Sequence, residues 1–295
     1  MKIEYLKFEK PMLCIGYDWE KYGDSDNNAV NEKDIEDSIK GLKTIFRIHS
    51  AYGASFTLFS LGKVLEVPNQ INAIRSLIDR SNLNSKVDIQ IHGYSHTPFL
   101  ELPNKPTFLS SSQVIEEIRK AKCLVNEIFK KNCTGLRPPY GHFQGLQRNP
   151  ELVYTLSQEG INFISSDLRN ENEQFPPPWN DNHGRVRNPY IYDFGSTKVL
   201  EIPTQGNADN LYRGVSKYIK TPALSTEEIL NIHISNLQKA AYDCLVYTPL
   251  FHVWVVGRFD EDGRIIAGLI DEAVKRKIDV VNYIELMNLV RSLDK

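Results

Sequence analysis

Short apolar runs alternate with amphipathic segments along most of the chain. The runs are rich in branched and aromatic side chains and predict buried strands. In chain order they cover residues 11–17, 55–60, 87–91, 134–137, 161–165, 198–202, 250–256 and 278–281. The segments between them repeat apolar residues at helical spacing, over residues 31–49, 69–81, 110–128, 149–158, 226–242, 265–275 and 284–293. This alternation of strands and helices predicts an α/β protein with a largely parallel sheet.

Local signals support several of these boundaries. Gly53 is a suitable stop for the first helix, and Ser110 with Gln113 forms a capping box at the start of the third. Residues 169–195 are polar and proline-rich, and we interpret them as an irregular excursion because a strand follows directly. The sequence contains no internal repeat. About seven strand–helix units without a boundary therefore predict a single barrel-like domain over residues 1–295.

Composition and charge exclude several classes of protein. The net charge of −2 predicts no electrostatic attraction to nucleic acid or to an anionic membrane. No apolar run approaches the length of a membrane span. The first residues lack the apolar stretch of a signal peptide, so we expect a cytoplasmic protein. The four cysteines are scattered without a C-x-x-C pair, which argues against a cysteine-type zinc site.

Five polar side chains stand at or just beyond the ends of predicted strands: Asp18, His92, Arg137, Asp167 and His252. In a parallel (β/α) barrel these strand ends face one mouth, where the reaction site is built. The placement therefore predicts that five segments far apart in the sequence converge on one site.

The segment from His92 to His96 places two imidazoles four residues apart. In one helical turn they would share a face and could bind one ion. Two histidines and one carboxylate leave positions open for water and substrate, which is typical of a catalytic metal site. An H-x-x-x-H pattern also arises by chance, so by itself it leaves open two ordinary surface or core histidines.

Two further segments offer oxyanion and acid–base chemistry. The prolines of Arg137-Pro138-Pro139-Tyr140-Gly141 fix the backbone, so a nearby amide N–H or the arginine could be held ready for an oxyanion. A carboxylate such as Asp167 paired with His252 would set the tautomer of the imidazole and raise its basicity. Taken separately, a structural turn, a surface aspartate and a buried histidine explain the same residues.

In sequence order, these segments resemble the polysaccharide deacetylases, carbohydrate esterase family 4, over nearly the whole chain. Four of the five motifs of that family are present. They are the H-x-x-x-H metal motif at His92 and His96, the R-x-P-Y turn at Arg137 to Tyr140, the weaker fourth motif at Ser165-Ser166-Asp167 and the L-x-H motif at Leu250 to His252. The ordered set is far more specific than any single motif.

The resemblance implies a distorted (β/α) barrel of about seven strands, of the polysaccharide-deacetylase type. It implies one divalent metal ion, usually Zn²⁺, bound by Asp18, His92 and His96. The implied reaction is hydrolysis of an N-acyl group, typically N-acetyl on an amino sugar.

Further roles follow from the resemblance by position. The backbone of the R-x-P-Y turn would help to hold the oxyanion, and an Asp167–His252 pair would supply the acid that protonates the departing amine. The residues expected to contact the substrate are Pro139, Tyr140, Leu250 and Trp254.

The first motif departs from the family pattern. Members usually carry two acidic residues there, the first as base and the second as metal ligand, whereas this chain has Gly16-Tyr17-Asp18-Trp19-Glu20. Aligning Asp18 with the metal ligand puts Gly16 at the position of the base, which typically contributes about 10²–10⁴-fold in rate. Glu20 could act as base from a different position or be solvated, an activated water could suffice, or catalysis could be lost. The role of Arg137, which orients the base in the family, is open for the same reason.

Three functions are compatible with these residues. The first is a metal-dependent hydrolase of carbohydrate metabolism that removes an acetyl or formyl group from an amino sugar or glycan precursor. Its substrate would be a small molecule or an oligosaccharide. The second is a catalytically silent carbohydrate- or partner-binding protein on the same fold, motivated by Gly16. The third, a glycoside hydrolase with paired carboxylates, leaves the histidines unexplained.

Overall fold

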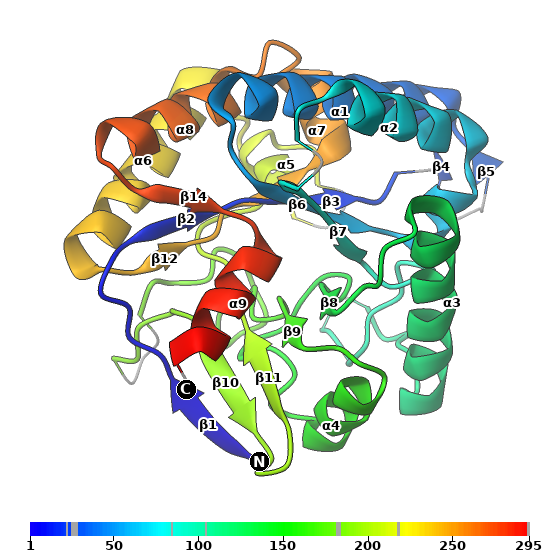
Figure 1. Cartoon of the computed structure of the whole chain (residues 1–295), viewed down its shortest axis with the longest axis vertical. Helices are drawn as coiled ribbons and strands as arrows, with labels where there is room; N and C mark the ends of the chain where they lie inside the picture. The colour runs from blue at the N-terminus through cyan, green and yellow to red at the C-terminus, as the bar shows by residue number, and fades with distance from the viewer. Residues whose placement is uncertain are drawn as a thin grey trace.

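The structure is a computed structural model that describes residues 1–21, 23–24, 29–83, 85–103, 105–180, 184–216 and 219–293 (Figure 1). Its strands are β1 (Lys2–Tyr5), β2 (Met12–Cys14), β3 (Gly16–Trp19), β4 (Gly23–Asp24), β5 (Ala29–Val30), β6 (Phe56–Ser60), β7 (Val87–Ile91), β8 (Gly135–Leu136), β9 (Phe163–Ile164), β10 (Tyr190–Asp193), β11 (Lys198–Glu201), β12 (Val246–Tyr247), β13 (Leu250–His252) and β14 (Asp279–Val281). Its helices are α1 (Glu32–Tyr52), α2 (Pro68–Arg80), α3 (Ser111–Phe129), α4 (Pro150–Gln158), α5 (Asp209–Tyr212), α6 (Thr226–Asp243), α7 (Val253–Phe259), α8 (Arg264–Lys275) and α9 (Tyr283–Leu293), with a 3₁₀ helix η1 (Gly62–Glu66).

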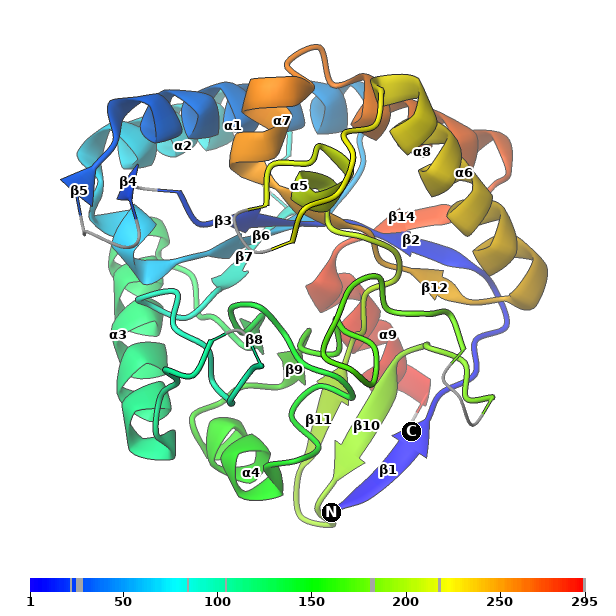
Figure 2. The same cartoon turned by 180° about the vertical axis from the view of Figure 1, so that it is seen from behind.

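The strands form a mainly parallel sheet surrounded by helices. The larger sheet has the order β1-β10-β11-β9-β8-β7-β6-β3-β13, and the pairs from β11 to β13 are parallel. A smaller parallel sheet, β12-β2-β14, continues from it because only Ile15 separates β2 from β3. Helices α1, α2, α3, α6 and α8 lie around the outside of the strands in both views (Figures 1 and 2). The predicted distorted (β/α) barrel is confirmed.

Hydrogen bonds of Gln205 join the two ends of the curved sheet. The backbone N–H of Gln205, just beyond β11, donates to the carbonyl of Thr248 at 3.3 Å, and the Thr248 N–H donates to Gln205 Oε1 at 2.8 Å. Gln205 is buried, so its amide satisfies backbone groups that a regular ladder would otherwise pair. The barrel is thus completed between β11 and β12 without strand pairing.

Two glycines bring α7 close to α1 and so position the residues that follow β13. A Cβ atom at Gly41 would lie 1.9 Å from the carbonyl oxygen of Val253, and one at Gly257 would lie 1.8 Å from the carbonyl oxygen of Asp37. Only glycine permits such a close approach of two backbones. The contact fixes the first turn of α7, which carries Trp254, beside the mouth of the barrel.

Two regions differ from the predicted elements. The predicted strand 250–256 ends at His252, and α7 begins at the next residue. An apolar run that is buried on all sides carries no periodicity, so a strand and a short helix cannot be distinguished in it. The excursion 169–195 contains β10, which pairs in antiparallel fashion with β1 and β11 at the edge of the sheet.

Other predicted boundaries agree with the structure. Gly53 ends α1 with φ 58°, and Ser110 begins α3 with the predicted capping box. Within the part of the chain that the structure describes, no helix is long and apolar enough to cross a membrane. The single domain over residues 1–295 and the cytoplasmic location stay predictions.

Candidate functional site

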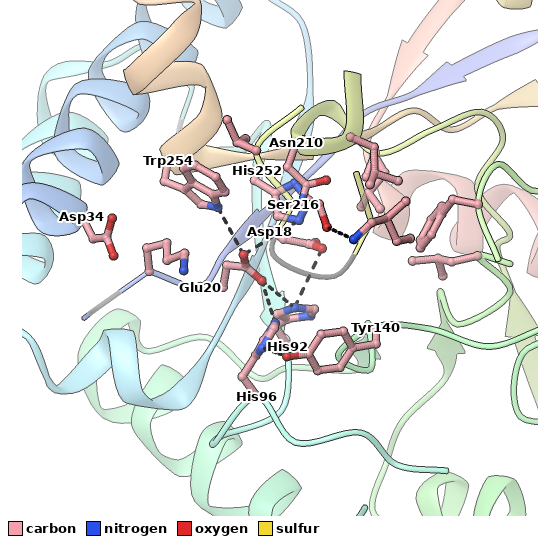
Figure 3. A pocket seen from close by; sticks show the side chains of 18 of the residues that line it. Asp18, Glu20, Asp34, His92, His96, Tyr140, Asn210, Ser216, His252 and Trp254 are labelled. Atoms are coloured by element: carbon pink, nitrogen blue, oxygen red, sulfur yellow. Dashed lines mark hydrogen bonds and ion pairs between the residues drawn. The ribbon is translucent and has the colours of Figure 1, made fainter. Parts of the chain in front are cut away.

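A pocket of about 430 Å³ lies at the carboxyl ends of β3, β7 and β13 (Figure 3). This volume is in the range of small-molecule sites. Of the five strand-end residues predicted to converge, Asp18, His92 and His252 line the pocket. Arg137 is fully buried beside Asp18, and Asp167 is buried among other residues that are described below.

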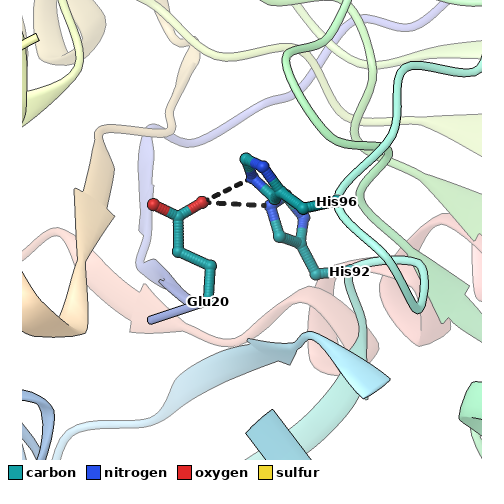
Figure 4. Close-up of side chains that lie close together, drawn as sticks. All are labelled: Glu20, His92 and His96. Atoms are coloured by element: carbon teal, nitrogen blue, oxygen red, sulfur yellow. Dashed lines mark ion pairs between the residues drawn. The ribbon is translucent and has the colours of Figure 1, made fainter. Parts of the chain in front are cut away.

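Three side chains form a cluster that could hold a metal ion: Glu20, His92 and His96 (Figure 4). Glu20 Oε2 lies 2.7 Å from His96 Nε2 and 3.6 Å from His92 Nε2. One carboxylate oxygen and two imidazole nitrogens therefore lie within 4.8 Å of one another. In the described residues Asp18, the expected third ligand, is not a member of this cluster, although its Oδ2 lies 3.8 Å from His92 Nε2.

The two histidines meet through an irregular turn, and the predicted helical turn is wrong. Gly93 and His96 both have positive φ, 75° and 64°, and the two imidazole rings lie 5.3 Å apart. Glu117 of α3 holds the turn, because its Oε2 accepts from the N–H groups of Tyr94 at 3.2 Å and Ser95 at 3.3 Å. Left-handed backbone, rather than helical spacing, therefore directs both rings to one point.

Each histidine has a partner on the ring nitrogen that faces away from Glu20. His92 Nδ1 lies 2.7 Å from the carbonyl oxygen of Arg137, so this nitrogen donates. His96 Nδ1 lies 3.1 Å from the hydroxyl of Tyr140. Such contacts fix the tautomer and the orientation of metal-binding histidines. They leave both Nε2 atoms directed toward Glu20, and this donor set fits a divalent ion such as Zn²⁺.

The electrostatics of the cluster suit a cation. Burial raises the pKa of Glu20, but His96 and His252 lower it more, so the pKa is held well below its usual value and the carboxylate is ionised. Burial lowers the pKa of His96, which favours its neutral imidazole. An ionised carboxylate and neutral imidazoles are the protonation states that metal binding requires.

Arg137 holds the Asp18 carboxylate through the oxygen that does not face His92. The guanidinium donates from Nη1 to Asp18 Oδ1 at 2.8 Å, contacts the hydroxyl of Tyr283 and lies 4.1 Å from the centre of the Phe59 ring. Both Asp18 and Arg137 are buried, so the ion pair is little screened by solvent. Asp18 Oδ2 remains directed toward the metal cluster.

Neighbouring side chains fill the space around Gly16, where the family pattern would place a base. A Cβ atom there would lie 2.8 Å from Tyr283, 3.0 Å from Phe59 and 3.2 Å from Arg137 Nη2. Any larger side chain would press on the aromatic residues that support the Arg137 guanidinium. The space around Gly16 is thus filled by Tyr283, Phe59 and Arg137, and the missing base at this position stays a prediction.

His252 is paired with Asp209, and the predicted Asp167–His252 pair is wrong. His252 Nδ1 lies 2.5 Å from Asp209 Oδ1, and Asp209 Oδ2 accepts from the His252 backbone N–H at 2.7 Å. Burial lowers the pKa of His252, but Asp209 and Glu20 raise it to about 9. The imidazole is thus a cation at neutral pH.

Asp167 is buried and contacts residues that lie outside the pocket lining. It forms an ion pair with Arg187, accepts from the backbone N–H of Gln144 at 3.0 Å and lies 3.4 Å from the hydroxyl of Tyr190. The fourth motif therefore supplies a buried anchor for the loop that follows β9. Its position after a strand resembled that of a catalytic carboxylate, but the chain turns away before Asp167 can reach His252.

Three of the four residues expected to contact the substrate line the pocket. Tyr140, Leu250 and Trp254 line the pocket. Pro139 is buried against the turn at Gly93, 3.4 Å from where a Cβ atom of that glycine would lie, and its neighbour Pro138 lines the pocket instead. Leu250 also belongs to a small apolar cluster in the pocket lining, together with Leu168, Phe175, Ala208, Leu211 and Ile219.

Sequence reasoning missed Asp209. It lies in the first turn of the short helix α5, in a segment without apolar periodicity, and it follows the irregular chain after β11. Its only local signal is an acidic residue at a helix start, which is common for electrostatic reasons alone. Its pairing with His252 depends on the folded path of the chain.

Comparisons with known proteins agree with the fold. The family model for polysaccharide deacetylase matches residues 34–163. The structure is similar to a protein described as a polysaccharide deacetylase from Mycobacterium smegmatis, with a TM-score of 0.73 and 14% identity over 99% of this chain and 94% of that one. A protein with the same description from Pseudomonas aeruginosa PAO1 gives a TM-score of 0.66 and 13% identity over 94% and 89% of the chains.

A third similar structure is a carbohydrate esterase family 4 pseudoenzyme from Bacillus anthracis, with a TM-score of 0.54 and 12% identity over 95% of this chain and 66% of that one. No curated protein sequence matches the chain. The matched segment includes His92, His96 and Arg137 but neither Glu20 nor His252. Residues 34–163 therefore match the family model for polysaccharide deacetylase, and the chain as a whole has the fold of these similar structures.

Proposed function

We propose that this protein is a metal-dependent amide hydrolase that removes an acetyl or formyl group from an amino sugar or glycan precursor. The observation that carries the proposal is that a possible metal-binding cluster, a carboxylate and a charged imidazole line one pocket. Glu20, His92 and His96 line the same pocket as the Asp18 carboxylate and the His252 imidazolium.

Glu20, His92 and His96 would hold the divalent ion, with Glu20 in the place first expected for Asp18. Two imidazoles and one carboxylate favour Zn²⁺ and leave a position for water and the acyl oxygen. The bound ion would polarise the carbonyl of the acyl group and stabilise the charge that develops on its oxygen.

Asp18 is the proposed general base. Its Oδ1 is tied to Arg137 at 2.8 Å, whereas its Oδ2 faces the metal cluster and is 3.8 Å from His92 Nε2. This geometry supports removal of a proton from the water that attacks the acyl carbon. On this proposal the first motif is complete, as Asp-x-Glu, and Arg137 orients the base.

His252 is the proposed general acid. Pairing with Asp209 keeps the imidazole charged, and its Nε2 lies 3.9 Å from Glu20 Oε1 on the pocket side. The proton on Nε2 would pass to the amine nitrogen as the C–N bond breaks. His252 and Asp18 are Cα partners on the neighbouring strands β13 and β3, so the proposed acid and base both face this pocket.

The dimensions of the pocket support a compact substrate. A volume of about 430 Å³ accommodates one or a few sugar rings. Tyr140 and Leu250 are the proposed contacts to the acyl group, and the backbone of the turn at Tyr140 would contribute to holding the oxyanion. We expect a cytoplasmic precursor of surface-glycan assembly as the substrate.

The alternative of a catalytically silent binding protein is motivated by Gly16. Against it stands the proposal that Asp18, oriented by Arg137, takes the role of the base. The similarity to a pseudoenzyme is at 12% identity and concerns the fold alone. A protein that binds a sugar without hydrolysing it is therefore one outcome of the experiment below.

The test is acid release by zinc-loaded protein from a panel of N-acetyl and N-formyl amino sugars, with Asp18→Asn and His252→Gln as matched inactive variants. We expect acetate or formate from at least one substrate and loss of about 10²–10⁴-fold in each variant. A chelator should abolish the reaction. Binding of sugars without acid release would contradict the proposal and support the silent alternative.

A further inference from the structure

Trp254 lines the pocket beside Glu20 (Figure 3). It is only 6% exposed. Its indole Nε1 donates to Glu20 Oε1 at 3.2 Å, which is the dashed contact between these residues in Figure 3. The residue first expected as a wall for the acyl group therefore also contacts the proposed metal ligand.

The contact decides which oxygen of Glu20 faces the histidines. Oε1 accepts from Trp254, and Oε2 is the atom that lies 2.7 Å from His96 and 3.6 Å from His92. A glutamate has one more rotatable bond than an aspartate, so its carboxylate loses more rotamer freedom when it binds a metal ion. A fixed donor on Oε1 reduces this loss by orienting the carboxylate beforehand.

An indole is suited to this task. Its N–H is a donor only, so it cannot compete with Glu20 for the metal ion as a ligand. It also does not titrate in the physiological range, so it stays a donor at every pH where the protein is folded.

The ring of Trp254 is itself fixed from the other side. The Arg258 guanidinium lies 4.9 Å from the ring centre, within the range of a cation–π contact. Arg258 donates to Asp37 at 2.6 Å and to Asp34 at 2.8 Å, both on α1. If the indole turned away from Glu20, it would lose its contact with Arg258, which is itself anchored to α1.

We propose that Trp254 is a positioning residue for the metal site: its indole N–H fixes the Glu20 carboxylate for coordination. The inference rests on the proposed metal-binding role of Glu20. It predicts that loss of the N–H weakens metal binding directly, before any effect on turnover.

The test compares Trp254→Phe with Trp179→Phe. Trp179 is a matched control, because its indole N–H also makes one side-chain hydrogen bond, to Asn236 Oδ1 at 2.9 Å, and it is not among the residues that line the pocket in the described part of the chain. Zinc affinity is measured by competition with a chromophoric chelator. Partners of metal ligands typically contribute about 10–100-fold in affinity, so we expect that loss in Trp254→Phe and wild-type affinity in Trp179→Phe.

A second background separates positioning from general packing. In a Glu20→Ala protein, whose weaker zinc binding is measured at raised zinc concentration, the acceptor is gone, so adding Trp254→Phe should not weaken zinc binding further. An equal loss in both backgrounds would overturn the inference. The visible spectrum of the Co²⁺ form should change in Trp254→Phe, because the geometry around the ion changes, and should stay constant in Trp179→Phe.

The outcomes for the two proposals are distinguishable. Wild-type protein that binds no zinc would overturn the proposed function and this inference together. Wild-type protein and Trp254→Phe that bind zinc equally would overturn the inference alone. If Trp254→Phe does not fold, replacement of Trp254 by benzothienylalanine keeps the ring shape, exchanges N–H for sulfur and gives the same comparison.

Discussion

Asp18 and Glu20 are two residues apart and have different partners for a simple geometric reason. Residues i and i+2 of an extended strand point to the same face, so both carboxylates enter the barrel mouth. Asp18 is the shorter side chain and stays beside the buried Arg137. Glu20 lies beyond the end of β3 and is one methylene longer, which lets it reach both imidazoles.

The same geometry explains why sequence alone did not assign these roles. An acidic pair with one residue between fits the segment in two registers, Gly16 with Asp18 or Asp18 with Glu20. The sequence pattern is compatible with both. The choice depends on the position of Arg137 and on the filled space at Gly16, which are tertiary properties.

At the scale of single residues, we predict that Asp209 sets the pH dependence of catalysis. A general acid must be protonated, so activity falls as pH rises through the pKa of His252, which Asp209 raises. Asp209→Asn removes the charge that favours imidazolium, which should move the alkaline limb of kcat to lower pH by about one unit or more. The pH profile of kcat measures this shift.

Asp167→Asn is the matched control, because Asp167 is paired with Arg187 and not with His252. It should leave the alkaline limb in place. A shift in Asp167→Asn with none in Asp209→Asn would contradict the assigned pair.

The elements of this protein differ in how well their sequences determine them. Helices with apolar periodicity and clear caps, such as α3 with its capping box and α1 with Gly53, agree with prediction within a few residues. The turn from His92 to His96 does not, because its shape depends on positive φ angles and on a carboxylate 21 or more residues away in α3. Site-bearing turns are therefore the least predictable part.

At the scale of elements, we predict that Glu117 of α3 supports metal binding through this turn. Its carboxylate accepts from the N–H groups of Tyr94 and Ser95, which lie between the two histidines. Glu117→Ala should loosen the turn and weaken zinc affinity about tenfold or more. Glu116→Ala, on the exposed side of the same helix, should have no effect. Equal affinities in the two variants would show that the turn holds its shape without α3.

For the molecule as a whole, the alternation of strands and helices was sufficient to predict the barrel, because burial of both faces of a parallel sheet leaves few other arrangements. Closure through Gln205 and the antiparallel edge of β1 and β10 was not predicted. Both depend on irregular segments that carry no periodicity. Asp209, on α5 a few residues after Gln205, lies in the same part of the chain.

At this scale we also predict how pH affects folding stability. His49 is buried and neutral, with Tyr17 and Ala54 as partners, and burial lowers its pKa to about 3. The unfolded chain binds a proton at this histidine below about pH 6.5, whereas the folded protein does not. The contribution of neutral His49 to stability is therefore present above pH 6.5 and is lost as pH falls toward 3.

Other buried groups oppose this effect, because burial raises the pKa of Asp88 and Asp260 to about 6. The difference between wild type and His49→Gln isolates the histidine, since both proteins keep the carboxyl groups. Between pH 7 and pH 5 the stability advantage of wild type should shrink by about 2 kcal/mol, at about 1.4 kcal/mol per unit of pKa difference. Urea unfolding at both pH values measures it, and a constant advantage would contradict the neutral assignment.

The central claim of this account is that Glu20 binds the metal ion and that Asp18 is the base. The most direct test is the metal content of purified wild-type, Glu20→Ala and Asp18→Asn proteins after zinc loading, measured by elemental mass spectrometry. We predict about one equivalent of zinc in wild type and in Asp18→Asn, and little in Glu20→Ala. Loss of zinc in Asp18→Asn with retention in Glu20→Ala would contradict the account and return Asp18 to the metal.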